Sequence, residues 1–174
     1  MKSINIGKLF GLQISFIPLV CIGIVGIWLS LSLLGSYTLD VPLGESVILG
    51  FAAMLLHYLL ELIHSLGHAI AAKWTGYPMV EIRFGVYGFY AQTIYPIGEP
   101  QLSSSTHIIR ALGGPIANLI LAFILFPTLS LWQGNWYWVG MFVFLDNLIY
   151  IVQVFIPLGF NDASTILNEL RKKK

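Results

Sequence analysis

Four long runs of apolar residues limit the folds that are open to this chain. A helix needs roughly 20 apolar residues to cross the hydrocarbon core of a bilayer, and four stretches have about that length: 14–34, 47–72, 110–131 and 136–159. The composition agrees, because 57% of the 174 residues are hydrophobic and only 10% are charged, against about 25% charged residues in a soluble domain. We therefore predict an all-α membrane protein with about four transmembrane helices, built as a single membrane domain over residues 1–174.

The residues that flank these runs support the assignment. Four aromatic residues gather where the third run ends and the fourth begins, as in the interfacial belt at a membrane surface: Trp132, Trp136, Tyr137 and Trp138. Pro157 and Gly159 lie at the end of the fourth run, where we expect them to break the helix.

The distribution of charge predicts the orientation of the chain. With four spans, all nine basic residues fall on one side of the membrane, whereas Asp40 and Glu45 occupy a loop on the other side. By the positive-inside rule we expect both termini in the cytoplasm, with the plasma membrane as the location. The basic residues 171–174 suit contact with anionic lipid, and no basic patch remains that would indicate nucleic-acid binding.

The connection between the second and third runs has a different character. Residues 79–97 are rich in Val, Ile, Phe and Tyr and contain Gly85 and Gly88. Such residues favour strands, and the glycines permit a turn. We expect a short membrane-associated β-hairpin here, and an interfacial loop with aromatic anchors is the equal alternative.

Two histidines and an aspartate form a candidate metal site. His64 and His68 are four residues apart, so a helix places them on one face about 6 Å apart along its axis. Asp162 follows the break after the fourth run, on the same predicted side of the membrane. Two imidazoles and one carboxylate leave a fourth position open, as in a catalytic zinc site. The pair would equally suit hydrogen bonds to neighbouring helices, a haem iron or another metal, and Asp162 could instead cap the helix that follows it.

Three segments resemble one known family. The segment HSLGHA (64–69) resembles the H-E-x-G-H-A segment of the site-2 protease family of intramembrane zinc metalloproteases. The segment ALGGPIAN (111–118) resembles its A-G-P-x-x-N segment, and residues 156–167 resemble its P-x-x-x-L-D-G-G-R-x-L segment. The three occur in the family's order and on the corresponding spans.

This resemblance implies a three-helix catalytic core with zinc as cofactor. It assigns the zinc ligands to His64, His68 and Asp162, and it places Asn118 near the site, where it would help to bind substrate. Without the resemblance, Asn118 fits equally well a hydrogen bond between packed helices. The resemblance also implies that the hairpin region receives an unwound segment of a transmembrane or membrane-associated peptide by strand addition.

The chain departs from the family at the position of the catalytic base. Ser65 stands where the family has a glutamate, which takes a proton from the attacking water and passes it to the leaving amine. A serine hydroxyl is a poor base near neutral pH, and loss of such a base typically lowers the rate by about 10²–10⁴. Ala163 and Val154 also replace a glycine and an asparagine of the family pattern.

Two acidic residues remain to be placed. Glu61 shares the helical face of the two histidines and could act as a displaced base, a fourth ligand or a hydrogen-bond partner of a histidine. His57 continues this face by one more turn, and Asp146 lies at a similar predicted depth in the fourth span. We therefore expect a structural pair of His57 with Asp146.

Three functions follow from these observations. The first is a pseudoprotease that keeps the zinc and the substrate groove but binds or sequesters a membrane peptide, because hydrolysis is impaired or lost. The second is an active intramembrane metalloprotease with Glu61 as its displaced base. The third is a membrane protein that carries a metal or haem on the same histidines.

Overall fold

The computed structural model describes residues 2–172. In that part of the chain, four helices are long and apolar enough to cross a membrane, so the protein is an integral membrane protein, as the apolar runs predict. Short 3-10 turns extend two of them, at Leu129–Leu131 and Gln153–Phe155. The α-helices are α1 (Val20–Thr38), α2 (Leu43–Trp74), α3 (Ser104–Thr128), α4 (Trp136–Val152) and the shorter α5 (Asp162–Lys172).

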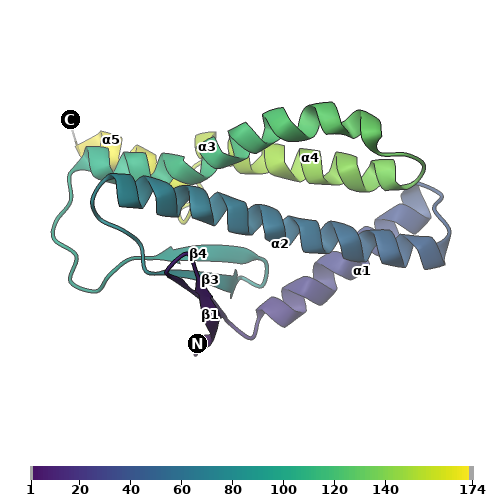
Figure 1. The fold of residues 1–174 in the computed structure, drawn as a ribbon, viewed down its shortest axis with the longest axis horizontal. Coiled ribbons are helices and arrows are strands. Elements are labelled where there is room, and N and C mark those ends of the chain that lie inside the picture. Colours follow the sequence, from purple (N-terminus) through teal and green to yellow (C-terminus); the bar gives the residue numbers. More distant parts are fainter. Residues whose placement is uncertain (1, 173–174) are drawn as a thin grey trace.

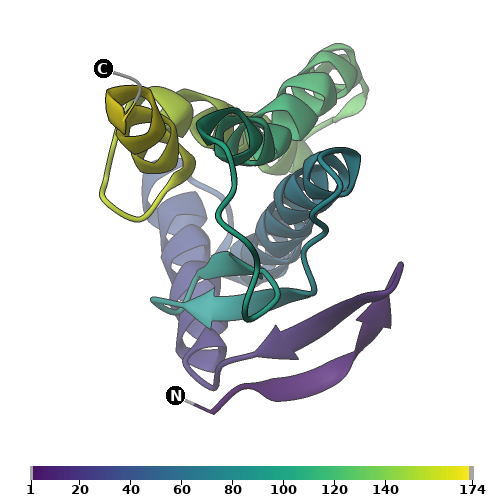
Figure 2. The same ribbon diagram turned by 90° about the vertical axis from the view of Figure 1, so that its left-hand side faces the viewer.

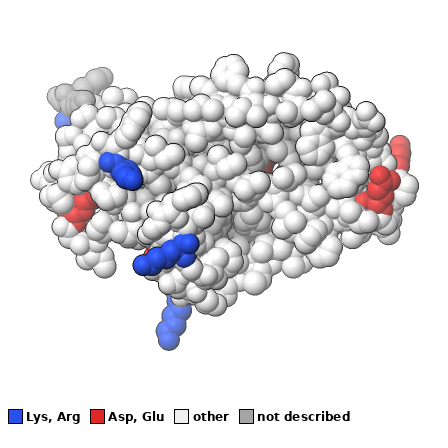
Figure 3. All heavy atoms as spheres, viewed as in Figure 1, with Lys and Arg blue, Asp and Glu red and all other residues white. Residues whose placement is uncertain are grey.

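Helix α2 runs through the middle of the molecule. Helices α3 and α4 lie along one side of it, and α1 and the sheet lie on the other (Figure 1). On the face drawn in Figure 3, the basic side chains lie at the end that carries the sheet, together with one acidic patch, and only acidic side chains show at the opposite end. Almost no charged atoms show between these ends, as expected for a surface that contacts lipid tails.

The sheet has four strands in the order β1-β2-β3-β4, with bounds Ile4–Leu9, Leu12–Phe16, Glu81–Val86 and Tyr90–Ile94. The expected hairpin between the second and third spans is confirmed, because β3 and β4 pair antiparallel. A second hairpin, β1–β2, joins it through a parallel pairing of β2 with β3, as Figure 2 shows. β4 lies at one edge of the sheet.

The first predicted span was wrong at its start. We placed it at 14–34, but Leu12–Phe16 forms strand β2 and the helix runs over Val20–Thr38. The apolar run conceals the boundary, because β2 is nearly as apolar as the helix. Within β2, Ser15 is fully buried and its hydroxyl donates a hydrogen bond to the Glu81 carboxylate on β3.

Other helix ends also differ from the predicted bounds: α1 ends at Thr38 rather than 34, and α2 runs over Leu43–Trp74 rather than 47–72. Helix α3 begins at Ser104 rather than near 110, because the Ser103 side chain caps it by accepting the Thr106 N–H at 3.2 Å. Helix α4 and its 3-10 turn end at Phe155 rather than near 159. There the Asn161 side chain donates to the Ile156 carbonyl at 2.8 Å, which folds the chain back before Pro157.

Two glycines bring α2 and α3 together beside the candidate site. A Cβ atom on Gly67 would collide with the carbonyl oxygen of Gly113, and a Cβ on Gly113 would collide with that of Gly67. Small residues allow helix backbones to approach closely in a membrane. This contact places the histidine face of α2 directly against the backbone of α3.

Candidate metal centre

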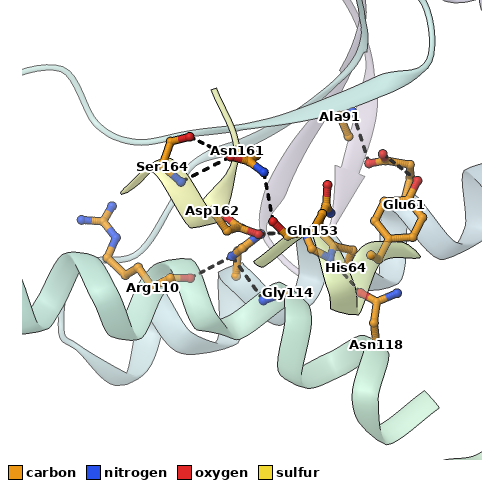
Figure 4. Close-up of polar contacts among 12 residues, drawn as sticks. Glu61, His64, Ala91, Arg110, Gly114, Asn118, Gln153, Asn161, Asp162 and Ser164 are labelled. Atoms are coloured by element: carbon orange, nitrogen blue, oxygen red, sulfur yellow. Dashed lines mark hydrogen bonds and ion pairs between the residues drawn. The ribbon is translucent and has the colours of Figure 1, made fainter. Parts of the chain in front are cut away.

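The structure brings together the three predicted ligand residues. The Nε2 atoms of His64 and His68 lie 3.0 Å apart. The two carboxylate oxygens of Asp162 lie 3.3 Å and 3.4 Å from these nitrogens, one facing each ring. Both histidines are buried, and the ligand atoms of all three residues lie within 4.8 Å of one another. Residues nearly 100 positions apart in the sequence therefore converge on one point, seen in Figure 4.

A chain of side-chain amides fixes the proton on His64. The Asn118 carbonyl oxygen of the backbone can only accept, so the Asn147 amide nitrogen at 2.9 Å must donate to it. The Asn147 side-chain oxygen then accepts from the Asn118 amide nitrogen at 2.7 Å. This leaves the Asn118 side-chain oxygen facing His64 Nδ1 at 2.7 Å as an acceptor. His64 therefore carries its proton on Nδ1, and its Nε2 is a free lone pair directed at the site.

Backbone groups of α3 hold His68 in the same way. Its Nδ1 lies 2.8 Å from the carbonyl oxygen of Arg110, which can only accept a hydrogen bond. The Gly114 N–H lies near the same nitrogen at 3.2 Å, but the shorter contact to an obligate acceptor makes Nδ1 the donor. His68 Nε2 is then a second lone pair that points at Asp162.

The three residues thus form a buried cluster of acceptors that lacks a positive charge. The Oδ2 atom of Asp162 is buried without a hydrogen-bond partner among residues 2–172. A Cβ atom on Gly114 would lie 2.5 Å from His68 Nε2, so glycine leaves room for the two imidazole rings against α3. Two imidazole nitrogens and a carboxylate are a donor set that suits zinc.

The residue before Asp162 frees it for this role. The Asn161 side-chain oxygen accepts the Ser164 N–H at 3.3 Å and the Ser164 hydroxyl at 2.8 Å. Asn161 is therefore the cap of α5, which answers the alternative that Asp162 serves as the cap. The Asp162 side chain points at the histidines instead.

Glu61 lies beside the cluster but faces other groups. One of its carboxylate oxygens accepts the Tyr150 hydroxyl at 2.8 Å, and the other accepts the Ala91 N–H at 3.2 Å. The Tyr150 ring packs against His64, with 5.3 Å between ring centroids. Glu61 thus ties α2 to α4 and to the edge strand β4. Ser65, at the family's glutamate position, is buried and brings no carboxylate.

The expected pair of His57 with Asp146 is confirmed. The His57 Nδ1 atom lies 2.8 Å from Asp146 Oδ2, and both side chains are nearly buried. His57 lies on the same face of α2 as His64, about two turns closer to the N-terminal end of the helix.

Sequence reasoning missed the contribution of α4 to the site. Asn147 orients Asn118, and Tyr150 packs against His64. Gln153 follows at the same spacing, and its side-chain nitrogen is buried without a partner among the described residues. Polar residues three apart within an apolar run share one helix face, and that pattern was the available signal.

Four membrane helices, with a buried His–His–Asp cluster that α2 and α5 form against α3, define an integral membrane protein with a candidate metal centre. Among solved structures, the chain is similar to the Site-2 Protease from Methanocaldococcus jannaschii, with a TM-score of 0.67 and 17% sequence identity over 99% of this chain and 73% of that chain. No family model and no curated protein sequence matches the chain. The chain therefore has a site-2-protease-like fold, as the three motifs implied.

Proposed function

We propose that this chain is a zinc-binding membrane protein with a site-2-protease-like fold that binds a membrane peptide and has impaired or lost peptide-bond hydrolysis. The observation that carries the proposal is the pairing of a complete acceptor cluster with a serine at the position of the base. His64, His68 and Asp162 converge with their lone pairs inward. Ser65 supplies no carboxylate beside them.

Zinc held by these three residues would act as a Lewis acid with one open coordination position. Hydrolysis would also need a group that moves a proton, and the chain's own residues do not provide one in the right place. Both oxygens of Glu61 accept hydrogen bonds, from Tyr150 and from Ala91. Glu61 is thereby a positioning residue for β4, which weakens the alternative of Glu61 as a displaced base.

The haem alternative fits the geometry less well. Two histidines that both ligate one haem iron bind it from opposite faces of the ring. His64 and His68 lie on one face of α2 with their Nε2 atoms 3.0 Å apart, so both approach a bound group from the same side. A single ion suits this arrangement.

The edge strand β4 is the proposed binding place for the peptide. An edge strand offers unpaired backbone groups to which an extended segment can add. Tyr90 of β4 packs edge-to-face against Phe160, with 5.9 Å between ring centroids, and Phe160 is two residues before Asp162. A segment paired with β4 would therefore pass close to the metal cluster. In this proposal both termini are cytoplasmic, so the peptide is read at the cytoplasmic end of the bundle.

Peptide cleavage by zinc-loaded protein in micelles tests the proposal. We expect Ser65→Glu to cleave a model transmembrane peptide at least about 10²-fold faster than the native chain. Ser65→Gln is the matched control, because it has nearly the same size and no base, and it should stay at the native rate. Native cleavage as fast as that of Ser65→Glu would contradict the proposal. Native cleavage that disappears in Glu61→Gln would establish the displaced base instead.

A further inference from the structure

A side chain of α2 occupies a backbone hydrogen-bonding position on the edge strand β4. One carboxylate oxygen of Glu61 accepts the Ala91 N–H at 3.2 Å, a contact that Figure 4 shows. Both residues are buried. In a sheet, the N–H of a strand residue pairs with a carbonyl of a neighbouring strand. At Ala91 the Glu61 carboxylate takes the place of that carbonyl.

The pairing of β3 determines which residues of β4 face the outer edge of the sheet. The Phe84 carbonyl accepts a backbone N–H from the residue just after β2, so Phe84 turns its backbone groups to β2. Successive residues of a strand turn these groups to alternate sides, so Arg83 faces β4, where it pairs with Gln92. Ala91 and Thr93 flank Gln92 and therefore turn their N–H and C=O groups to the outer edge.

A peptide strand that adds to this edge needs the N–H that Glu61 holds. Strand addition pairs the outward N–H and C=O groups of the edge strand with those of the incoming segment. A peptide carbonyl therefore has to replace the Glu61 carboxylate at Ala91. A hydrogen bond to a carboxylate is roughly twice as strong as one between neutral groups, so the replacement opposes binding at this position.

The surroundings hold this contact in place. The other oxygen of Glu61 accepts the Tyr150 hydroxyl at 2.8 Å, and the Tyr150 ring packs against His64. The Ala91 side chain belongs to a hydrophobic cluster with Phe84 of β3, and β4 packs against α2. The contact thus joins the edge of β4 to the wall of the candidate metal centre.

We propose that the hydrogen bond from Ala91 to Glu61 is an autoinhibitory contact, which keeps the β4 edge beside the metal centre closed until an extended peptide displaces the carboxylate. This inference rests on the proposed function, because the contact acts on the peptide that is proposed to add to β4. A helix uses its own carbonyls for its i to i+4 hydrogen bonds. Only an unwound segment can offer a carbonyl to Ala91, so the contact selects against intact transmembrane helices.

Peptide binding in liposomes tests this contact with the full, zinc-loaded chain. A donor dye on Cys21, the one cysteine of the sequence, transfers energy to a dye-labelled single-span peptide that ends in alternating Thr and Val residues. We expect Glu61→Gln to bind this peptide about three- to tenfold more tightly than the native chain, because a neutral amide replaces the carboxylate. Glu61→Met has a similar length and no strong acceptor, and it should gain at least as much. Asp146→Asn is the matched control with native affinity, because it makes the same exchange at a carboxylate whose partner is His57.

Two further measurements separate the contact from the binding place. Thr93→Pro removes another outward N–H of β4, which an edge strand tolerates, and it should weaken peptide binding by the native chain and by Glu61→Gln. Without peptide, amide hydrogen exchange at Ala91 should be about three- to tenfold faster in Glu61→Gln. Weaker binding in Thr93→Pro with native affinity in both Glu61 variants would overturn the contact and leave the binding place standing, as would unchanged exchange at Ala91. Native affinity in Thr93→Pro would overturn both.

Discussion

Replacement of Asn118 by Ala should weaken zinc binding without touching a ligand. Asn118 accepts the His64 Nδ1–H at 2.7 Å and donates to Asn147 at 2.7 Å. In its absence, His64 can carry its proton on Nε2, which then cannot bind a metal. Loss of such an outer hydrogen bond typically lowers metal affinity about 10–100-fold, which corresponds to about 1.4–2.8 kcal/mol.

The same substitution should also lower the stability of the metal-free protein. It leaves His64 Nδ1 and the Asn147 side-chain oxygen buried without partners, and each such atom costs about 1–3 kcal/mol. Asn147→Ala should have a smaller effect on zinc, below about tenfold, because Asn118 keeps its contact with His64 and loses only the group that orients its amide.

Competition with a chromophoric chelator in micelles measures these affinities. Asn135→Ala is the matched control, because it removes an Asn amide that bonds to Glu45 at 3.0 Å, at the other end of the bundle. This control should bind zinc like the native chain. If Asn118→Ala also binds zinc with native affinity, the amide chain does not set the tautomer of His64 and the reasoning is wrong.

Three further perturbations act on separate parts of the structure. Gly67→Ala should lower the free energy of unfolding by about 1–3 kcal/mol and weaken zinc binding, because the new Cβ collides with the Gly113 carbonyl; thermal unfolding in micelles measures it, and an unchanged midpoint would refute the close contact. Asp146→Leu should destabilise the protein by about 1–3 kcal/mol through the unpaired His57, and Asp146→Asn by less, because it keeps an acceptor; equal losses in denaturation curves would speak against the hydrogen bond at 2.8 Å. Burial raises the pKa of Glu81, but hydrogen bonds from Arg83 and Ser15 lower it more, so its pKa in the folded protein is below 4.5. The carboxylate therefore stabilises the fold above about pH 4.5, and this stabilisation is lost as the pH falls through the folded pKa. Glu81→Gln should therefore flatten the acid limb of a stability–pH curve, and a curve of unchanged slope would show that this carboxylate does not contribute.

Much of the fold could be predicted because the membrane leaves few options. Only helices and closed sheets satisfy the backbone in lipid, so apolar runs of about 20 residues located all four spans. The spacing of His64 and His68 placed both rings on one face, and matching depth paired His57 with Asp146. These predictions depend on periodicity within a span or on depth, and neither requires knowledge of how the helices pack.

The remainder depended on contacts that a single sequence does not encode locally. Residues Leu12–Phe16 form β2 although they are nearly as apolar as the helix that follows, because pairing with β3 decides their conformation. Glu61 lies on the histidine face, and only the positions of Tyr150 and Ala91 reveal that both its oxygens are engaged. The role of Asn147 likewise depends on α4 packing against α3, which brings two amides within 2.7 Å.

The zinc content of the purified protein tests the central claim most directly. Native mass spectrometry after loading with zinc and gel filtration should show one ion per chain. The ion should be lost in Asp162→Ala and retained in Ser65→Glu, because Asp162 closes the cluster of acceptors and Ser65 contributes no ligand. A native chain that retains no zinc, or an Asp162→Ala chain that binds it as tightly as the native one, would contradict a metal centre formed by His64, His68 and Asp162.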